Sequence, residues 1–158
     1  MKNLNLFFGQ LFLVLLALTG LLAITFLVPQ ISLELATRYS EFSNDELIIR
    51  VLLTMPIVIA IAVFLEVMYL QRLVHLDRMS SSRAYKWVKL LTITPLVLAA
   101  SFVFIGLWLS WNKALPPFYF FTLLALSVFS LAVSAVTHSL LGLLRRATSA
   151  SEELEGVV

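Results

Sequence analysis

The chain has 158 residues, of which 61% are hydrophobic and 13% are charged, with a formal net charge of +2. Soluble domains carry about half apolar and about a quarter charged residues, so this composition excludes an ordinary soluble fold. The chain contains no cysteine, which excludes disulfides, thiolate metal ligands and cysteine nucleophiles. Its apolar residues gather in four long blocks, each near the roughly 20 residues that cross a bilayer. The sequence therefore predicts an all-α integral membrane protein, a four-helix up-and-down bundle that forms a single transmembrane domain.

The first predicted span covers about residues 4–28. Its apolar run is about twice the length of a signal-peptide core, and no small-residue cleavage motif follows it, so we expect an uncleaved span. Pro29 is expected to end this helix, because a proline in a helix interior removes a hydrogen bond. The following polar segment, 30–44, mixes apolar and charged residues. It fits either a short helix on the membrane surface or an irregular loop.

The second apolar block begins with a helix-start signal. Ser43 and Glu46 form a capping-box pattern directly before it. The second span is expected over 46–72, with Pro56 inside it as a kink that neighbouring helices can accommodate. A cytoplasmic loop is expected over 73–85.

The two remaining blocks predict the third span over 86–111 and the fourth over 118–144. The third helix is expected to begin before its span, so that its first turns project beyond the apolar layer. Arg145 and Arg146 are expected to end the fourth helix. The tail, 147–158, is short and acidic and is expected to fray.

The cations divide unequally between the two ends of the spans. Most of them flank one side: Lys2, Arg72, Arg78, Arg83, Lys86, Lys89, Arg145 and Arg146. Only Arg38, Arg50 and Lys113 flank the other side. Because cytoplasmic segments of membrane proteins are enriched in Lys and Arg, both termini and the 73–85 loop are predicted to lie in the cytoplasm.

Two ionisable residues, Glu66 and His138, lie inside apolar blocks and are candidates for a functional site. Each lies roughly 9–10 Å from the cytoplasmic end of its span, at a rise of about 1.5 Å per residue. At that common depth they could pair as a proton relay, a ligand site or a pH-sensitive contact. The alternatives are a purely structural polar contact, or two side chains that reach the interface separately.

Small residues recur at helical spacing in the last two spans. Ser127, Ser130 and Ser134 share one face of the fourth span with His138. Stripes of this kind let membrane helices approach closely and hydrogen-bond to one another, so we interpret the serines as a helix-packing face.

No catalytic pattern occurs in the sequence. Paired carboxylates, histidines at metal-binding spacing, a nucleophile elbow and a glycine-rich phosphate loop are all missing. We therefore expect a non-enzymatic protein with no metal and no cofactor. The cations flank the spans and do not form a basic surface interleaved with aromatic residues, so direct nucleic-acid binding is not expected.

Two charged segments on the predicted cytoplasmic side are candidate contact surfaces. The loop and the start of the third helix carry Arg72, Arg78, Arg83, Lys86 and Lys89, and the tail carries Glu152, Glu153 and Glu155. Anionic lipid headgroups would account for the basic residues. An acidic partner, or the acidic tail of the chain itself, would account for them as well.

Several segments resemble a bacterial family of small four-helix membrane proteins, the YoaS-like proteins. They are Met55 and Pro56, LQRLVHLD at 70–77, SSRAYKWVK at 81–89 and the ending SEELEGVV at 151–158. Members of this family are often encoded beside Cro/CI-type helix-turn-helix regulators. The resemblance implies a location in the bacterial inner membrane and a role in holding or releasing such a regulator.

These observations lead to one main hypothesis and two alternatives. The main hypothesis is a non-enzymatic inner-membrane protein that sequesters or modulates a cytoplasmic helix-turn-helix regulator through the loop and the acidic tail. The first alternative is a small oligomeric permease or proton-linked transporter that uses Glu66 and His138. The second is an accessory subunit of a larger membrane complex. The expected partners are the lipid bilayer and a cytoplasmic protein, with association into a homo-oligomer left open.

Overall fold

The computed structural model describes the backbone of residues 2–39, 42, 44–75, 82–112 and 117–155, and the side chains of 7–39, 42, 44–75, 84–112 and 117–143. Its helices are α1 (Lys2–Leu22), the π-helical segment η1 (Ala23–Leu27), α2 (Val28–Arg38), α3 (Glu46–His75), α4 (Ser82–Trp111) and α5 (Pro117–Glu155). No strand occurs in the described part of the chain, so the predicted all-α class is confirmed.

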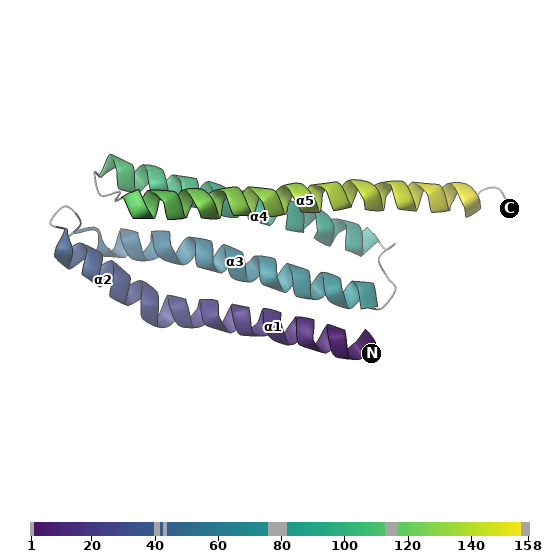
Figure 1. Cartoon of the computed structure of the whole chain (residues 1–158), viewed down its shortest axis with the longest axis horizontal. Coiled ribbons are helices and arrows are strands. Elements are labelled where there is room, and N and C mark those ends of the chain that lie inside the picture. Colours follow the sequence, from purple (N-terminus) through teal and green to yellow (C-terminus); the bar gives the residue numbers. More distant parts are fainter. Residues whose placement is uncertain (1, 40–41, 43, 76–81, 113–116, 156–158) are drawn as a thin grey trace.

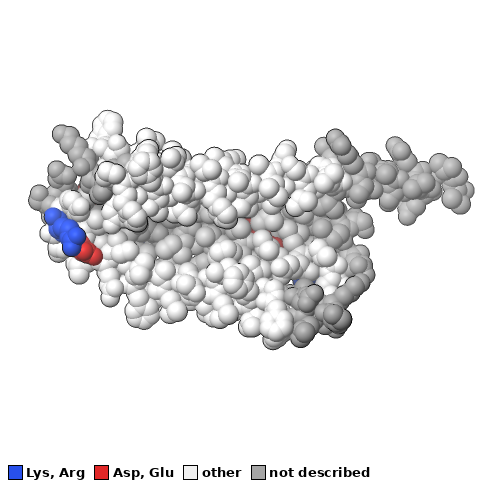
Figure 2. Space-filling model, viewed as in Figure 1, with Lys and Arg blue, Asp and Glu red and all other residues white. Residues whose placement is uncertain are grey.

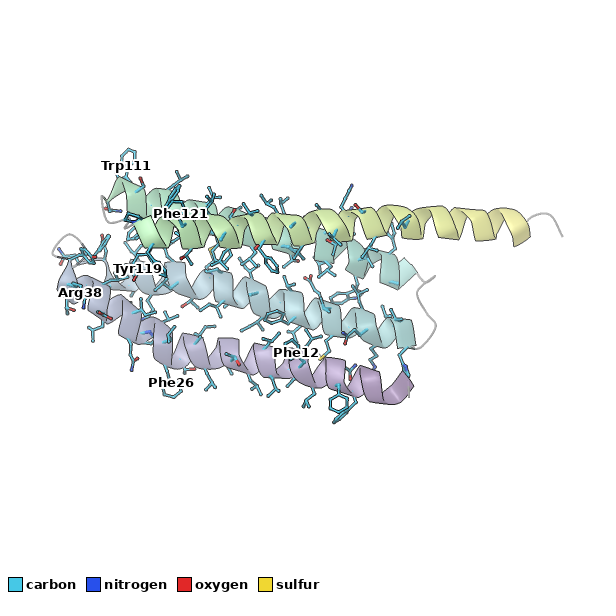
Figure 3. All side chains as sticks on the ribbon, in the orientation of Figure 1. Phe12, Phe26, Arg38, Trp111, Tyr119 and Phe121 are labelled. Atoms are coloured by element: carbon cyan, nitrogen blue, oxygen red, sulfur yellow. The ribbon has the colours of Figure 1, made fainter. Side chains whose placement is uncertain are left out.

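Four helical stretches are long and apolar enough to cross a membrane: Phe7–Arg38, Glu46–His75, Ala84–Trp111 and Pro117–Leu143. Their most apolar windows have mean hydropathies between 2.1 and 2.8. Large apolar side chains such as Phe12, Phe26 and Phe121 point outward along the helices (Figure 3). A soluble protein does not expose apolar surface on this scale, so the exposed side chains are suited to lipid and the chain is a multi-pass membrane protein.

The helices pack as a row rather than as a square. α3 packs against α1 and α2 on one side and against α4 on the other, and α4 packs most extensively against α5. The N-terminus, the end of α3, the start of α4 and the C-terminus all lie at the same end of the bundle (Figure 1). The up-and-down topology predicted from the sequence is therefore confirmed, and we call this end the terminal end. The other end carries α2 and the turn after α4.

The prediction that Pro29 ends the first helix is wrong. The chain stays helical from Lys2 to Arg38, with η1 just before the proline. In η1 the Val28 N–H donates to the Ala23 carbonyl, five residues earlier. This wider turn lets a new α-helix begin at Val28, so Pro29 lies in the first turn of α2, where a backbone N–H needs no partner within the helix.

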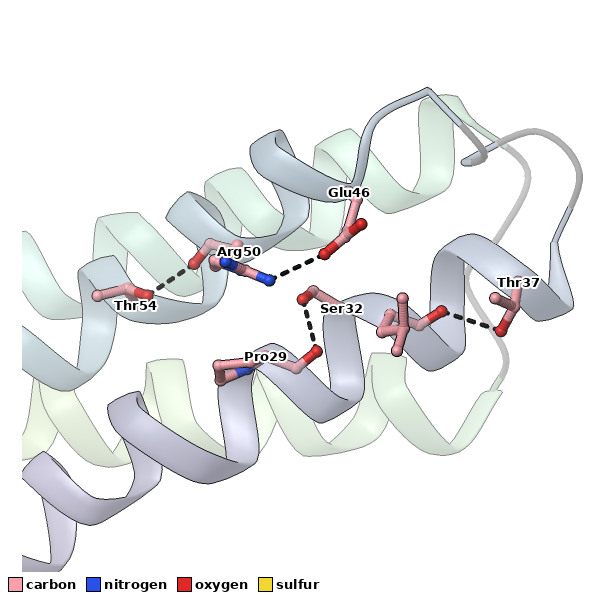
Figure 4. A network of polar contacts seen from close by, with 7 residues as sticks. Pro29, Ser32, Thr37, Glu46, Arg50 and Thr54 are labelled. Atoms are coloured by element: carbon pink, nitrogen blue, oxygen red, sulfur yellow. Dashed lines mark hydrogen bonds and ion pairs between the residues drawn. The ribbon is translucent and has the colours of Figure 1, made fainter.

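The segment 30–44 is thus largely a continuation of the first span. Ser32 is fully buried and its hydroxyl donates to the Pro29 carbonyl at 3.0 Å (Figure 4). The whole stretch Phe7–Arg38 is 32 residues long, or about 48 Å at about 1.5 Å per residue. This length exceeds the hydrocarbon layer, which is only about 30 Å thick.

The second long helix, α3, begins at Glu46, and Pro56 lies inside it without interrupting the helix. The side chain of Glu46 accepts a 2.9 Å hydrogen bond from Arg50, one turn later (Figure 4). Ser43, the other half of the predicted capping box, lies outside the described residues.

The prediction that Arg145 and Arg146 end the last helix is also wrong. α5 continues through both arginines and most of the acidic tail to Glu155, so residues 147–155 are helical rather than frayed. No glycine or proline occurs between 143 and 155. Charged residues do not stop a helix once it has left the membrane, because their helix propensity is high.

A cluster of buried residues lies at the end of the bundle opposite the terminal end. Phe42 is 0% exposed and packs with Ile49, and Tyr39, Leu53 and Trp108 lie around them. The Phe42 and Trp108 rings stack with their centroids 5.4 Å apart. This aromatic cluster packs the segment after α2 against α3 and α4 and so holds the helices together at that end.

Candidate functional site

The serine stripe of α5 faces α4. Ser127, Ser130 and Ser134 are all buried. The Ser134 hydroxyl donates to the Thr92 carbonyl of α4 at 2.7 Å, which is a direct bond between the two helices. Small side chains that hydrogen-bond across a membrane interface allow such close packing. The stripe therefore lies in the interface between α4 and α5, a position in which small residues allow helices to pack closely.

Glu66 and His138 do not meet. Glu66 is 5% exposed, and its Oε1 accepts a 2.7 Å hydrogen bond from the Thr94 hydroxyl of α4. His138 is exposed, and its neighbour Thr137 takes the buried position on α5. The physical reason is the row arrangement: α4 lies between α3 and α5, so a buried residue of α3 reaches α4 first. In place of the predicted pairing with His138, Glu66 contacts Thr94.

A large cavity lies beside Glu66. Its volume is about 650 Å³, and it is lined by Gln10 of α1, Trp87 of α4 and a run of α3 residues: Ala62, Leu65, Glu66, Met68, Tyr69, Arg72 and His75. Figure 2 shows a few acidic atoms between the helices, away from the two ends of the bundle. A cavity of this size can hold a small organic molecule.

Two aromatic rings form part of the cavity wall. Tyr69 and Trp87 lie with their ring centroids 4.6 Å apart, at an angle of 41°. Neither ring, nor Gln10, is among the site residues predicted from the sequence. Two features of the sequence point to these residues. Ala62, Glu66 and Tyr69 are spaced so that they share one face of a helix. Gln10 is an isolated amide within an apolar block.

The basic residues of the terminal end are accessible where the structure describes them. Arg72 and His75 at the end of α3, and Lys86 and Lys89 in the first turns of α4, are exposed. Arg83 lies in the first turn of α4 and only its backbone is described, while Arg78 lies outside the described residues. The structure therefore supports an accessible basic surface made by α3 and α4.

The acidic residues Glu152, Glu153 and Glu155 belong to the last turn and a half of α5, whose backbone alone is described there. Figure 1 shows this part of α5 projecting beyond the other helices at the terminal end. The acidic helix end therefore points away from the bundle and is not folded back over it.

The opposite end carries two exposed ion pairs, Glu34 with Arg38 at 3.0 Å and Glu46 with Arg50 at 2.9 Å. Charged side chains are visible there in Figure 2, while the face between the two ends is almost free of charge. Each pair joins residues one turn apart on the same helix. Exposed pairs of this kind contribute a few tenths of a kcal/mol to stability, about 0.3–0.5 each.

Within the described residues, no group of three or more histidine, aspartate or glutamate side chains gathers as a metal site would require. Residues 30–158 match a family described as a protein of unknown function, DUF2975. The chain belongs to the DUF2975 family. No curated protein and no solved structure matches the chain.

The part of this DUF2975 protein that matches the family begins within α2 and includes α3, α4 and α5. It therefore contains Glu66, Thr94 and both aromatic rings of the cavity. Gln10, which α1 contributes to the cavity wall, precedes the matched region.

Proposed function

We propose that this DUF2975 protein is a non-enzymatic protein of the bacterial inner membrane, with both termini in the cytoplasm, that binds a basic cytoplasmic protein through the end of α5. The observation that carries this proposal is the continuation of α5 past the apolar span to Glu155. The eleven residues from Arg145 to Glu155 correspond to about 16 Å of helix at about 1.5 Å per residue. An extension of that length reaches well into the aqueous phase.

The charge on this extension favours a basic partner. The residues Glu152, Glu153 and Glu155 occur at the carboxyl end of a helix, and no basic residue occurs in its last turn. The helix dipole is negative at that end, so each carboxylate there is unfavourable by about 0.3–1 kcal/mol. A partner that brings cations to the helix end would remove this repulsion.

A helix-turn-helix regulator has the required chemistry. DNA-binding domains carry a basic face that contacts phosphates, and the resemblance to YoaS-like proteins implies such a partner. If that face bound the acidic end of α5, it could not bind DNA at the same time. The protein would then hold the regulator at the membrane and release it when the contact is broken.

The orientation can be tested directly, because the natural chain has no cysteine. We expect Asn112→Cys, at the end opposite the terminal end, to react with a membrane-impermeant maleimide in spheroplasts. Ala150→Cys, in the α5 extension, should react only after the membrane is broken. The measurement is the labelled fraction of each single-cysteine variant, with the cysteine-free chain as the blank. The reverse labelling pattern would place α5 outside and end the proposal.

The partner contact predicts a charge-dependent complex. We expect a helix-turn-helix protein to be recovered with the tagged chain from native membranes in mild detergent, and recovery to fall about tenfold in a variant with Glu152, Glu153 and Glu155 changed to glutamine. Three exposed charge contacts of about 0.5 kcal/mol each correspond to about that factor. Recovered proteins are identified and quantified by mass spectrometry.

The matched control is the double variant Glu34→Gln and Glu46→Gln, which removes carboxylates at the other end of the bundle. This control should recover as much regulator as the natural chain. Recovery of the chain alone would contradict the proposal, and recovery of a large membrane complex would instead favour an accessory subunit.

A further inference from the structure

The cavity beside Glu66 is lined by residues of opposite charge. Glu66 lines its deeper part together with Ala62, whereas Arg72 and His75 line it six and nine residues closer to the end of α3. At about 1.5 Å per residue these separations are about 9 Å and about 14 Å along the helix. We infer that this cavity binds a small zwitterion, with its ammonium group at Glu66 and its acidic group at Arg72.

The carboxylate of Glu66 is incompletely paired. Oε1 accepts from Thr94, but Oε2 is buried and has no hydrogen-bond partner. The ion pairs found among the described side chains are those at the other end of the bundle, so no described cation is paired with Glu66. A buried carboxylate without a counter-charge is costly, and an ammonium ion would supply that charge.

The contact with Thr94 does not account for this carboxylate. The Thr94 hydroxyl also lies 3.0 Å from the Leu90 carbonyl of its own helix, so it has a hydrogen-bond acceptor without Glu66. An apolar side chain at position 66 would pack between α3 and α4 at no electrostatic cost. The glutamate is therefore better explained by a ligand than by the stability of the bundle.

The remaining wall of the cavity fits an ammonium ion carried on a short hydrocarbon chain. The rings of Tyr69 and Trp87 line the same cavity as Glu66, and aromatic faces attract organic cations. Ala62, Leu65 and Met68 supply apolar surface for methylene groups. The exposed guanidinium of Arg72 supplies paired donors for a carboxylate or phosphate.

This chemistry has two sources, a free amino acid-like molecule from the aqueous phase and the headgroup of an aminophospholipid. Both present one ammonium and one acidic group. The ligand site is also separate from the partner contact, because the cavity is built from α1, α3 and α4 and the partner contact from the end of α5. If the protein fails to bind a ligand, its binding to the partner can therefore still be tested, and the reverse also holds.

The test uses the full chain in phosphatidylcholine nanodiscs and isothermal titration calorimetry with 6-aminohexanoate. Hexylamine and hexanoate, which carry only one of its two charges, are titrated alongside. We expect 6-aminohexanoate to bind more tightly than either. Glu66→Gln should weaken both 6-aminohexanoate and hexylamine by at least about tenfold, the factor for losing about 1.4 kcal/mol. Arg72→Gln should weaken 6-aminohexanoate alone.

A parallel sample in nanodiscs that contain phosphatidylethanolamine is examined by native mass spectrometry for retained lipid. Retention that is lost in Glu66→Gln identifies the lipid headgroup as the source, and calorimetric binding without retention identifies the free zwitterion. Glu46→Gln, a glutamate of the same helix outside the cavity, is the matched control and should leave both results unchanged.

Three results would overturn the inference: no binding of an ammonium compound or aminophospholipid to the natural chain, binding that Glu66→Gln leaves unchanged, or equal weakening by Glu46→Gln. If Glu66→Gln does not fold, as judged by gel filtration, the binding of 6-aminohexanoate and hexylamine to Arg72→Gln tests the inference. A preference for 6-aminohexanoate over hexylamine that survives this change would contradict the inference.

Discussion

Replacing Phe42 with alanine is expected to lower the free energy of unfolding by about 3–5 kcal/mol, the usual range for a fully buried phenylalanine. The ring is 0% exposed, stacks on Trp108 of α4 and contacts Tyr39 edge-on. Its removal leaves a cavity at the point where the chain after α2 is held against α3 and α4. The rings of Tyr39 and Trp108, which Phe42 contacts directly, would lose their packing partner.

The loss would be measured by reversible unfolding in mixed micelles, with helix content as the signal and denaturing detergent as the variable. Phe118→Ala is the matched control, because Phe118 is 74% exposed and should change stability little. Equal losses in the two variants would show that Phe42 does not anchor the bundle.

Ser134→Leu is expected to separate α4 from α5 and to lower the free energy of unfolding by about 1–3 kcal/mol, as overpacked sites do. Ser134 is buried and its hydroxyl touches the backbone of α4, so the position has no room for a branched side chain. The change also removes a hydrogen bond between helices, which contributes about 0.6 kcal/mol on average in membrane proteins.

Ser139→Leu is the matched control for this prediction. Ser139 is on the same helix but is exposed, and its hydroxyl donates to Ala135 of its own helix. The same unfolding measurement should show little change for Ser139→Leu, because leucine is suited to a lipid-facing position. A destabilisation as large as that of Ser134→Leu would indicate that residue 139, too, contacts protein.

The spans could be predicted from the sequence because burial in lipid depends on composition and length, which the sequence contains directly. The helix ends were harder to predict. At Pro29 the rule that proline ends a helix failed, because a π-helical segment directly before it moved the proline into a first turn. At Arg145 the edge of the apolar block predicts the end of the helix, but α5 continues, because lipid contact and helix propensity are separate properties.

The candidate site was predicted only in part for a geometrical reason. The sequence gives the depth of Glu66 and His138 in their helices, and both depths are similar. It does not say which helices are neighbours, and successive residues on a helix point about 100° apart. That rotation makes Thr137 buried and leaves His138 exposed. Trp87 and Gln10 could not be assigned to the site from the sequence for the same reason. The sequence does not say which helices pack side by side, and the structure does.

The row of helices also bears on how the protein is made. α1 and α2 pack on α3, α3 on α4, and α4 on α5, which is the order in which the ribosome produces them. Each helical hairpin can close as soon as its second member enters the bilayer, and no late helix has to be inserted between two earlier ones. Contacts between elements adjacent in sequence also form quickly, because short connections have a low cost of loop closure. The chain can therefore assemble during synthesis, one helix at a time, from its first helix to its last.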